Sequence, residues 1–280
     1  MSSLQVRAPQ IQLSDGELIW SKIPEFSLAY NGYSVVIPYV EFYLNSVMND
    51  VKDGYCENQP ALREDLNQFI KQEVQHARFH MRYNKRMFAL NIEGLPELVE
   101  EIQADLKKLR ETKSLAFNVG YCAGFECIAT FDSVYLYEQC DEFFEGADPH
   151  GANLLLWHVA EEFEHRCVCH DAFTAVSGNY FTRIYALVYA FMHVGGAFMR
   201  SEELILQHYL KDKPESVRKA SIKQSKKLFW RQIRYVAPRM LKIFLPGYNP
   251  ARLRMPKRIK SALDFFKRAD PITKRVELVI

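Results

Sequence analysis

A repeated spacing of glutamate and histidine constrains this 280-residue chain more than any other feature of its sequence. One glutamate stands inside an apolar, aromatic stretch, and a Glu-x-x-His pair follows it after 32 residues in the first copy and 36 in the second. The two copies consist of Glu41, Glu73 and His76, and of Glu126, Glu162 and His165. A repeat of this kind indicates one structural unit used twice, so we expect two similar pairs of antiparallel helices.

Long segments without Gly or Pro indicate that the repeated units are helical. Residues 61–90 contain neither residue and have the apolar periodicity of an amphipathic helix. Residues 97–145 form one long helix or a broken pair, with Gly120 and Gly124 as the expected interruption. With few Gly and Pro and no convincing alternating strand, the chain is predicted to be all-α. Further helices are predicted over 38–50, 149–177, 181–210, 214–244 and 258–268.

The polar residues of these helices converge on one side. Because successive residues turn by about 100°, the stretch WHVAEEFEH places His158, Glu162 and His165 within an arc of roughly 60°. Glutamates buried alone in apolar helices would carry a large desolvation cost, which bound cations remove. Four carboxylates and two imidazoles from two helix pairs are the ligand set of a dinuclear metal site in a helical bundle. Such ligands favour iron or manganese.

The ordered ligand set resembles the ferritin-like di-iron carboxylate superfamily, which implies a ferritin-like four-helix bundle with additional C-terminal helices. The spacing His-x-x-x-Glu-x-x-His that begins at His158 resembles the p-aminobenzoate N-oxygenase family, in which a third histidine completes seven ligands. The stretches QEVQHARFH, WHVAEEFEH and FLPGYNP are similar to a family described as "predicted metal-dependent hydrolase". Together these resemblances imply the metal ligands Glu41, Glu73, His76, Glu126, His158, Glu162 and His165.

The resemblance to the superfamily also implies residues that orient the ligands. There an acidic or amide residue often precedes a ligand glutamate and bonds a ligand histidine, and Gln72 and Glu161 hold those places here. For Glu161 a solvent-facing charge is the alternative. His80 departs from the pattern: it is an eighth ligand, a proton relay or a core histidine, and we favour the relay or a bond to a ligand. The candidates for an apolar pocket wall, with core packing as the alternative, are Phe42, Tyr43, Phe125, Phe131 and Trp157.

These features predict a non-haem di-iron oxygenase with no catalytic residue beyond its metal centre. It would use two iron ions (manganese or a mixed pair as alternatives) and O2 to hydroxylate or N-oxygenate a small or lipid-like substrate. A dinuclear metal-dependent hydrolase with a bridging hydroxide needs the same ligands and is the alternative. An iron-binding or storage protein is the third hypothesis. No nucleophile elbow, P-loop or dinucleotide fingerprint supports another mechanism.

Charge is distributed unevenly along the chain. Residues 1–215 hold 18 Lys and Arg against 31 Asp and Glu, whereas residues 216–263 hold 14 Lys and Arg and no acid. This basic C-terminal region predicts contact with an anionic membrane surface or an electron-donor protein; packing on the acidic body is the alternative. No nucleic-acid partner is expected because no binding module accompanies the charge. The sequence does not decide whether the chain forms a homodimer.

Three parts are predicted along the chain: a leader over 1–30, a metal-binding four-helix bundle over 31–178, and additional helices with the basic region over 179–280. The apolar segment Ile184–Met199 is too short to cross a bilayer, which favours a buried core helix. Six cysteines without a CxxC motif, and no cleavable apolar N-terminus, predict free thiols and a cytoplasmic protein, with a peripheral location at the inner face of a membrane as a variant.

Overall fold

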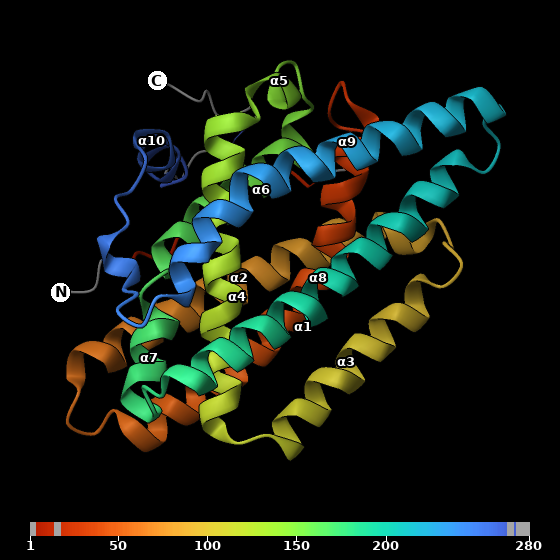
Figure 1. Ribbon diagram of the computed structural model, residues 1–280. Coiled ribbons are helices and arrows are strands. Elements are labelled where there is room, and N and C mark those ends of the chain that lie inside the picture. Colours follow the sequence, from red (N-terminus) through yellow and green to blue (C-terminus); the bar gives the residue numbers. More distant parts are fainter. Residues whose placement is uncertain (1–3, 14–17, 268–271, 273–280) are drawn as a thin grey trace.

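The computed structural model describes residues 4–13, 18–267 and 272, and over these residues the chain is all-α, as predicted (Figure 1). An isolated bridge between Ile11 and Ile272 is the β structure found among them. Two 3-10 helices, η1 (Leu241–Phe244) and η2 (Pro250–Arg252), connect the last two α-helices. The α-helices are α1 (Pro24–Tyr55), α2 (Pro60–Ala89), α3 (Leu95–Thr112), α4 (Leu115–Gln139), α5 (Asp141–Phe144), α6 (Pro149–His165), α7 (Val168–Val176), α8 (Tyr180–Leu210), α9 (Glu215–Met240) and α10 (Lys257–Phe265).

Local sequence explains where the site-bearing helices begin. Proline occupies the first turn of α1, α2 and α6, where its missing N–H would have had no partner within the helix. The Ser114 side chain accepts a hydrogen bond from the Phe117 N–H at the start of α4, and Asp148 accepts one from the His150 N–H at the start of α6. These caps stabilise the two helix starts by about 1 kcal/mol each.

Two helix breaks differ from the prediction. The segment 97–145 breaks at Lys113 and Ser114, so the expected interruption at Gly120 and Gly124 is wrong. Both glycines lie inside α4, where they let α8 approach closely: a Cβ at Gly120 would lie 2.9 Å from the Ala186 Cβ, and one at Gly124 would lie 2.8 Å from the Leu187 Cα. The predicted helix over 149–177 is also divided, into α6 and α7. Helix packing, which local sequence does not reveal, explains the two glycines.

Helix α4 lies at the centre of the molecule. It contacts α6, α7, α8 and α9, and it is apolar on nearly all sides because nearly all sides are covered. Helix α1 packs along α2 and under α8. In Figure 1, α1, α3 and α8 slope in one direction while α4 crosses them. The ferritin-like arrangement and the three predicted domain ranges stay predictions.

Helix α8 is buried on one side only. Its inner face packs on α1 and α4, whereas Tyr185, Val188 and Met192 are exposed on the outer face. The segment Ile184–Met199, which was predicted as a buried core helix, is therefore buried on its inner face. The prediction is wrong for its outer face, which is exposed. Within the described residues no helix combines the length and apolarity needed to cross a bilayer. All six cysteines are free thiols, as predicted.

The basic C-terminal region packs in part on the acidic body. Arg231 of α9 pairs with Glu142 of α5, and Arg258 of α10 pairs with Asp141 at 2.7 Å. Contact with a membrane or with a donor protein stays a prediction.

Asp132 of α4, which accepts a hydrogen bond from the Gln232 amide of α9, makes stability depend on pH. Burial raises the pKa of this carboxyl from 3.8 to about 6, although the bond from Gln232 opposes the rise. Because the folded state binds the proton more tightly, this contribution to stability is complete below the unfolded pKa and is lost as pH rises through about 6. Asp132→Asn should therefore stabilise the metal-free protein at neutral pH by about 1–2 kcal/mol, allowing for partial solvent exposure.

Urea unfolding of this variant at acidic and neutral pH checks the expectation. The gain should vanish below the unfolded pKa of 3.8. Asp212→Asn, at an exposed position of the loop after α8, is the matched control. It should leave the free energy of unfolding unchanged at both pH values. An equal effect of Asp132→Asn at both pH values would contradict the assignment.

Candidate metal centre

Four helices bring all seven predicted ligands into one buried cluster. Helix α1 supplies Glu41, α2 supplies Glu73 and His76, α4 supplies Glu126, and α6 supplies the remaining three. The seven residues divide into two groups that could each hold a metal ion, and in each group the donor atoms all lie within 4.8 Å of one another. The first group is Glu41, His76, His158 and Glu162, and the second is Glu73, Glu126, Glu162 and His165. Glu162 belongs to both, as a carboxylate shared by two adjacent cations would.

In the first group the donor atoms gather around one oxygen of Glu162. The His158 Nε2 lies 2.8 Å from the Glu162 Oε1 and 3.4 Å from the Glu41 Oε1. The His76 Nδ1 lies 3.5 Å from the same Glu162 oxygen and 3.8 Å from the Glu41 Oε1. Two imidazoles thus face two carboxylates across a space that a cation could fill.

The second group repeats this arrangement around the same oxygen of Glu162. The His165 Nδ1 lies 2.8 Å from the Glu73 Oε1 and 3.6 Å from both the Glu126 Oε2 and the Glu162 Oε1. Glu73 also lies 3.9 Å from the His76 Nδ1 of the first group. The side chains of both groups are at most 2% exposed.

Most of the inward-facing atoms of the cluster lack hydrogen-bond partners. Neither oxygen of Glu41, Glu73 or Glu126 has one, and the Oε2 of Glu162 and the Nδ1 of His76 have none either. A buried polar atom without a partner costs about 1–3 kcal/mol, and more when charged. Metal coordination would satisfy these atoms together. The residues present therefore fit a pair of metal ions.

The pKa shifts of the cluster residues also indicate a site for cations. Burial raises the pKa of Glu41 and of Glu126 well above the usual value, and repulsion by Glu162 and its neighbours raises them further. Although burial opposes it, attraction to Glu73 and Glu162 raises the pKa of His165 well above its usual value. The cluster without cations thus favours protonation at several positions. Metal ions would replace these protons and keep all four carboxylates ionised.

Outer contacts fix which ring nitrogen of His76 faces the cluster. Its Nε2 lies 2.9 Å from the Oε2 of Glu161, and since an ionised carboxylate only accepts, the Nε2–H donates. The Nδ1 is then left as the donor atom toward the metal position. Burial, followed by repulsion from His158, lowers the pKa of His76 to about 3, so the ring is neutral. Glu161 is fully buried, which makes the solvent-facing alternative for this residue wrong.

His165 is held in the same way by Gln72. Its Nε2 lies 3.2 Å from the Oε1 of Gln72 and donates to it, while the Gln72 amide nitrogen donates to the Oε2 of Glu164 at 3.2 Å and to the Gln5 carbonyl at 3.1 Å. The Nδ1 of His165 therefore points inward. Gln72 and Glu161 thus occupy the places that the family resemblance implied, one beside each histidine.

A third chain of bonds orients His158. Ser34 donates its hydroxyl proton to the Asn84 Oδ1 at 2.6 Å, so it accepts from the His80 Nδ1–H at 2.7 Å. His80 is then left with a bare Nε2, which accepts from the Nδ1–H of His158 at 2.6 Å. The Nε2 of His158 faces the Oε1 of Glu162 at 2.8 Å, and a cation bound between the two atoms would replace this contact. His80 belongs to neither group of candidate ligands, and its contacts favour a residue that bonds a ligand, although the proton-relay role stays a prediction.

One residue that the sequence analysis missed is Arg7, which lies in the segment predicted as a leader. Its Nη1 donates to the Glu161 Oε1 at 2.8 Å and to the Glu164 Oε2 at 2.7 Å, and its Nη2 donates to the Glu164 Oε1 at 3.1 Å. All three residues are buried. The three glutamates of WHVAEEFEH gave the available signal, because buried acids outside the ligand set need a cation.

Aromatic rings enclose the histidines, though not all of those predicted. Trp157 packs on His76 with ring centroids 4.9 Å apart, as expected for a wall residue. Phe69 packs on His165 at 4.7 Å and Tyr33 on His158 at 5.8 Å, and neither was predicted. Phe42 is 45% exposed, so its prediction as a wall residue is wrong: it lies on the outer face of α1.

The family model described as "Predicted metal-dependent hydrolase" matches residues 5–253, a range that includes all seven candidate ligands and Arg7. Neither the curated proteins nor the solved structures gave a match. The family match confirms the resemblance drawn from the sequence motifs. It agrees better with the hydrolase alternative than with the oxygenase prediction.

Proposed function

The chain belongs to the family of predicted metal-dependent hydrolases, and we propose that it is a metal-dependent enzyme whose two cations share Glu162. The observation that carries this proposal is the set of buried, inward-facing carboxylate and imidazole atoms without hydrogen-bond partners. Every outward-facing ring nitrogen of the three histidines has a partner. Such a division between inner and outer atoms is what metal ligation requires.

For the reaction we propose an O2-dependent oxidation at two iron ions. Bound iron would supply electrons to O2, whereas bound metal in a hydrolase would supply Lewis acidity. Four carboxylates cancel the charge of two divalent cations, which weakens their effect on the acidity of water and favours loss of electrons. In the overall reaction one oxygen atom of O2 enters the substrate and the other leaves as water, with two electrons from an external reductant and two protons from the solvent.

Residues of the chain prepare this chemistry in three ways. The four glutamates balance the charge of the cations, and Glu161 and Gln72 hold two histidine rings in one orientation. Trp157, Phe69 and Tyr33 cover the histidines with apolar surface. A dry site protects an oxidant from side reactions with water.

Hydrolysis is the second candidate, and the family description favours it. The same carboxylates would hold two cations for attack of water on an ester, amide or phosphoester. This reaction requires that water and a polar group reach a cluster whose side chains are at most 2% exposed, so part of the wall would have to open.

Metal analysis followed by O2 uptake separates the candidates. The anaerobic protein, loaded with Fe(II), should hold about two ions per chain. On addition of O2 it should consume O2 as both ions are oxidised, and Glu162→Gln should not. Turnover of esters, amides or phosphoesters without O2 would overturn the oxidation and support hydrolysis. Iron loading far above two ions per chain would overturn both in favour of storage.

A further inference from the structure

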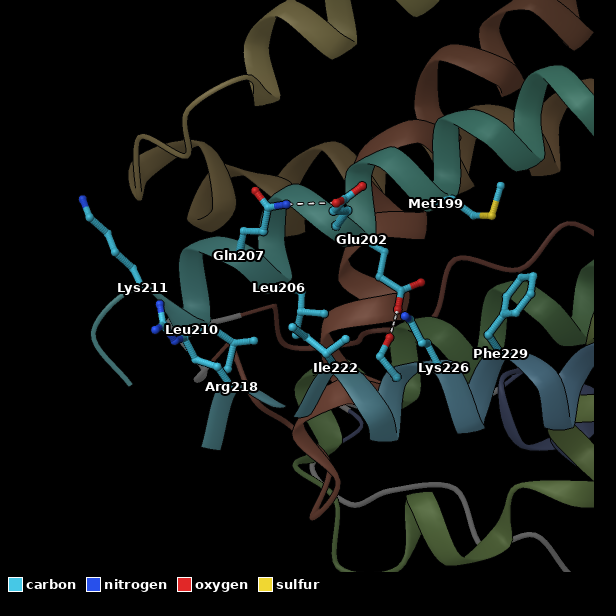
Figure 2. A pocket seen from close by; sticks show the side chains of 12 residues that line it. Met199, Glu202, Leu206, Gln207, Leu210, Lys211, Arg218, Ile222, Lys226 and Phe229 are labelled. Atoms are coloured by element: carbon cyan, nitrogen blue, oxygen red, sulfur yellow. Dashed lines mark hydrogen bonds between the residues drawn. The ribbon is translucent and has the colours of Figure 1, made fainter. Parts of the chain in front are cut away.

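A groove lies between α8 and α9 on the outside of the molecule (Figure 2). Its volume is about 640 Å³, within the range of sites that bind small molecules. None of its lining residues belongs to the metal cluster. The lining is mostly apolar, with charged side chains around it: Met199, Glu202, Glu203, Leu206, Gln207, Leu210, Lys211, Arg218, Ile222, Ser225, Lys226 and Phe229.

The acidic and the basic side chains of the groove differ in whether they have partners. Both acids are engaged: Glu202 accepts from the Ser225 hydroxyl at 2.6 Å, and Glu203 accepts from the Gln207 amide at 2.9 Å. Its three cations, in contrast, form no ion pair with the described residues. These cations are Lys211, Arg218 and Lys226, and all three are exposed. The groove therefore offers unpaired positive charge beside apolar surface.

Two of the three cations lie toward one end of the groove, whereas the third, Lys226, lies beside Phe229 toward the other end. Figure 2 shows Lys211 and Arg218 together near the turn that joins the two helices, with Met199 and Phe229 at the other end. Leu206 and Ile222 lie between them. The twelve helical steps from Met199 to Lys211, the residue that follows α8, correspond to a rise of about 18 Å. A ligand that fits this pattern has an anionic head and one extended apolar tail.

The apolar end of the groove lies close to the metal cluster. Phe198, the neighbour of Met199, packs on Tyr33 with ring centroids 4.8 Å apart, and Tyr33 packs on the candidate ligand His158 at 5.8 Å. The backbones of α1 and α8 touch here, since a Cβ at Gly32 would lie 2.7 Å from the Glu202 nitrogen. Two aromatic rings in contact, Phe198 and Tyr33, therefore connect the neighbour of Met199 with the cluster.

We propose that the groove binds a long-chain carboxylate, with its head group at Lys211 and Arg218 and its tail directed toward Met199 and Phe229. The two cations would attract an anionic head group, and the apolar lining would bind an alkyl tail. We further propose that this carboxylate is the substrate of the metal centre, which it would approach past Tyr33. The second part rests on the proposed function, whereas the first does not.

Binding is tested on the full-length, metal-free protein by calorimetry with dodecanoate below its micelle concentration. Dodecyltrimethylammonium, which has the same tail and the opposite charge, should bind at least about tenfold more weakly. The double variant Lys211→Glu with Arg218→Glu should weaken dodecanoate binding by about tenfold or more. Its matched control, Lys223→Glu with Lys227→Glu, makes the same charge change at exposed positions of α9 outside the groove and should leave binding unchanged.

A second pair of variants tests the place of the tail. Ile222→Trp should fill the groove and reduce dodecanoate binding by about tenfold without changing the melting temperature, because Ile222 is 44% exposed. Val217→Trp, at a position of α9 that is 45% exposed and outside the groove, should bind normally. Equal binding of both amphiphiles, or equal loss in the test and control variants, would overturn the groove assignment.

Turnover separates the two parts of the proposal. If the iron-loaded enzyme consumes O2 with its reductant and dodecanoate binds yet stays unoxidised, the carboxylate is not the substrate. If dodecanoate binds and no O2 is consumed under any condition, the proposed oxidation fails while the binding site stands. Oxidation of dodecanoate that Ile222→Trp suppresses and Val217→Trp does not would support both parts.

Discussion

Replacing Glu162 with glutamine will remove both metal ions at once. The Oε1 of this carboxylate lies within 3.6 Å of a ring nitrogen of each of the three histidines, and the residue belongs to both candidate groups. Loss of one anionic ligand from both sites should weaken binding of each ion by more than about 100-fold, beyond the usual effect of changing a residue that only supports a ligand. Metal analysis after dialysis, with calorimetry of metal binding, measures the result.

Three further glutamine variants give this test its controls. Glu41→Gln should weaken one site and Glu126→Gln the other, because each residue belongs to one group only. Glu145→Gln, at a side chain 77% exposed, should weaken neither. Glu41→Gln should also stabilise the metal-free protein at neutral pH, because burial and carboxylate repulsion raise the pKa of this group. Two ions held with normal affinity by the Glu162 variant would refute the shared carboxylate.

Replacing Arg7 with alanine is the second change expected to have a large effect. It leaves Glu161 and Glu164 buried without their cation, which should cost about 3–5 kcal/mol of the free energy of unfolding. Because Glu161 orients His76, metal affinity should also fall by about 10–100-fold. Urea unfolding and metal titration measure the two effects separately.

A double-mutant cycle distinguishes loss of the ion pair from general damage. With Glu164→Gln in the background, Arg7→Ala should cost less, since one unpaired carboxylate has been removed. The matched control is Arg63→Ala, in an exposed pair with Asp53 at 3.9 Å, which should cost under about 1 kcal/mol. Equal losses at the two arginines would contradict the role assigned to Arg7.

The sequence predicted the helices and the ligand cluster because both depend on short-range spacing. A Glu-x-x-His pair lies on one helix face whatever the rest of the chain does, and the repeat indicated that two such faces meet. The roles of Gly120, Gly124 and Phe42 depend instead on which helix packs on which, and here the prediction failed. The role of Arg7 was missed for a similar reason, because its partner Glu161 is 154 positions away in the sequence. No local pattern joins residues at that separation.

The type of reaction is harder to predict from the sequence than the type of site. The same carboxylates and imidazoles can serve O2 reduction or hydrolysis, and the choice depends on the charge left on the cations and on access of water. We propose the first because the site is enclosed and rich in carboxylates, whereas the family description favours the second.

The long separation between Arg7 and Glu161 has a consequence for the order of assembly during translation. The paired helices α1 and α2 carry Glu41, Glu73 and His76, which amount to less than half of the ligands and none of the shared carboxylate. Arg7 finds its partners only after α6 has been synthesised, because 154 positions separate it from Glu161. For the proposed metal centre we therefore expect tight capture of metal only after α6, which carries the shared carboxylate, has been synthesised.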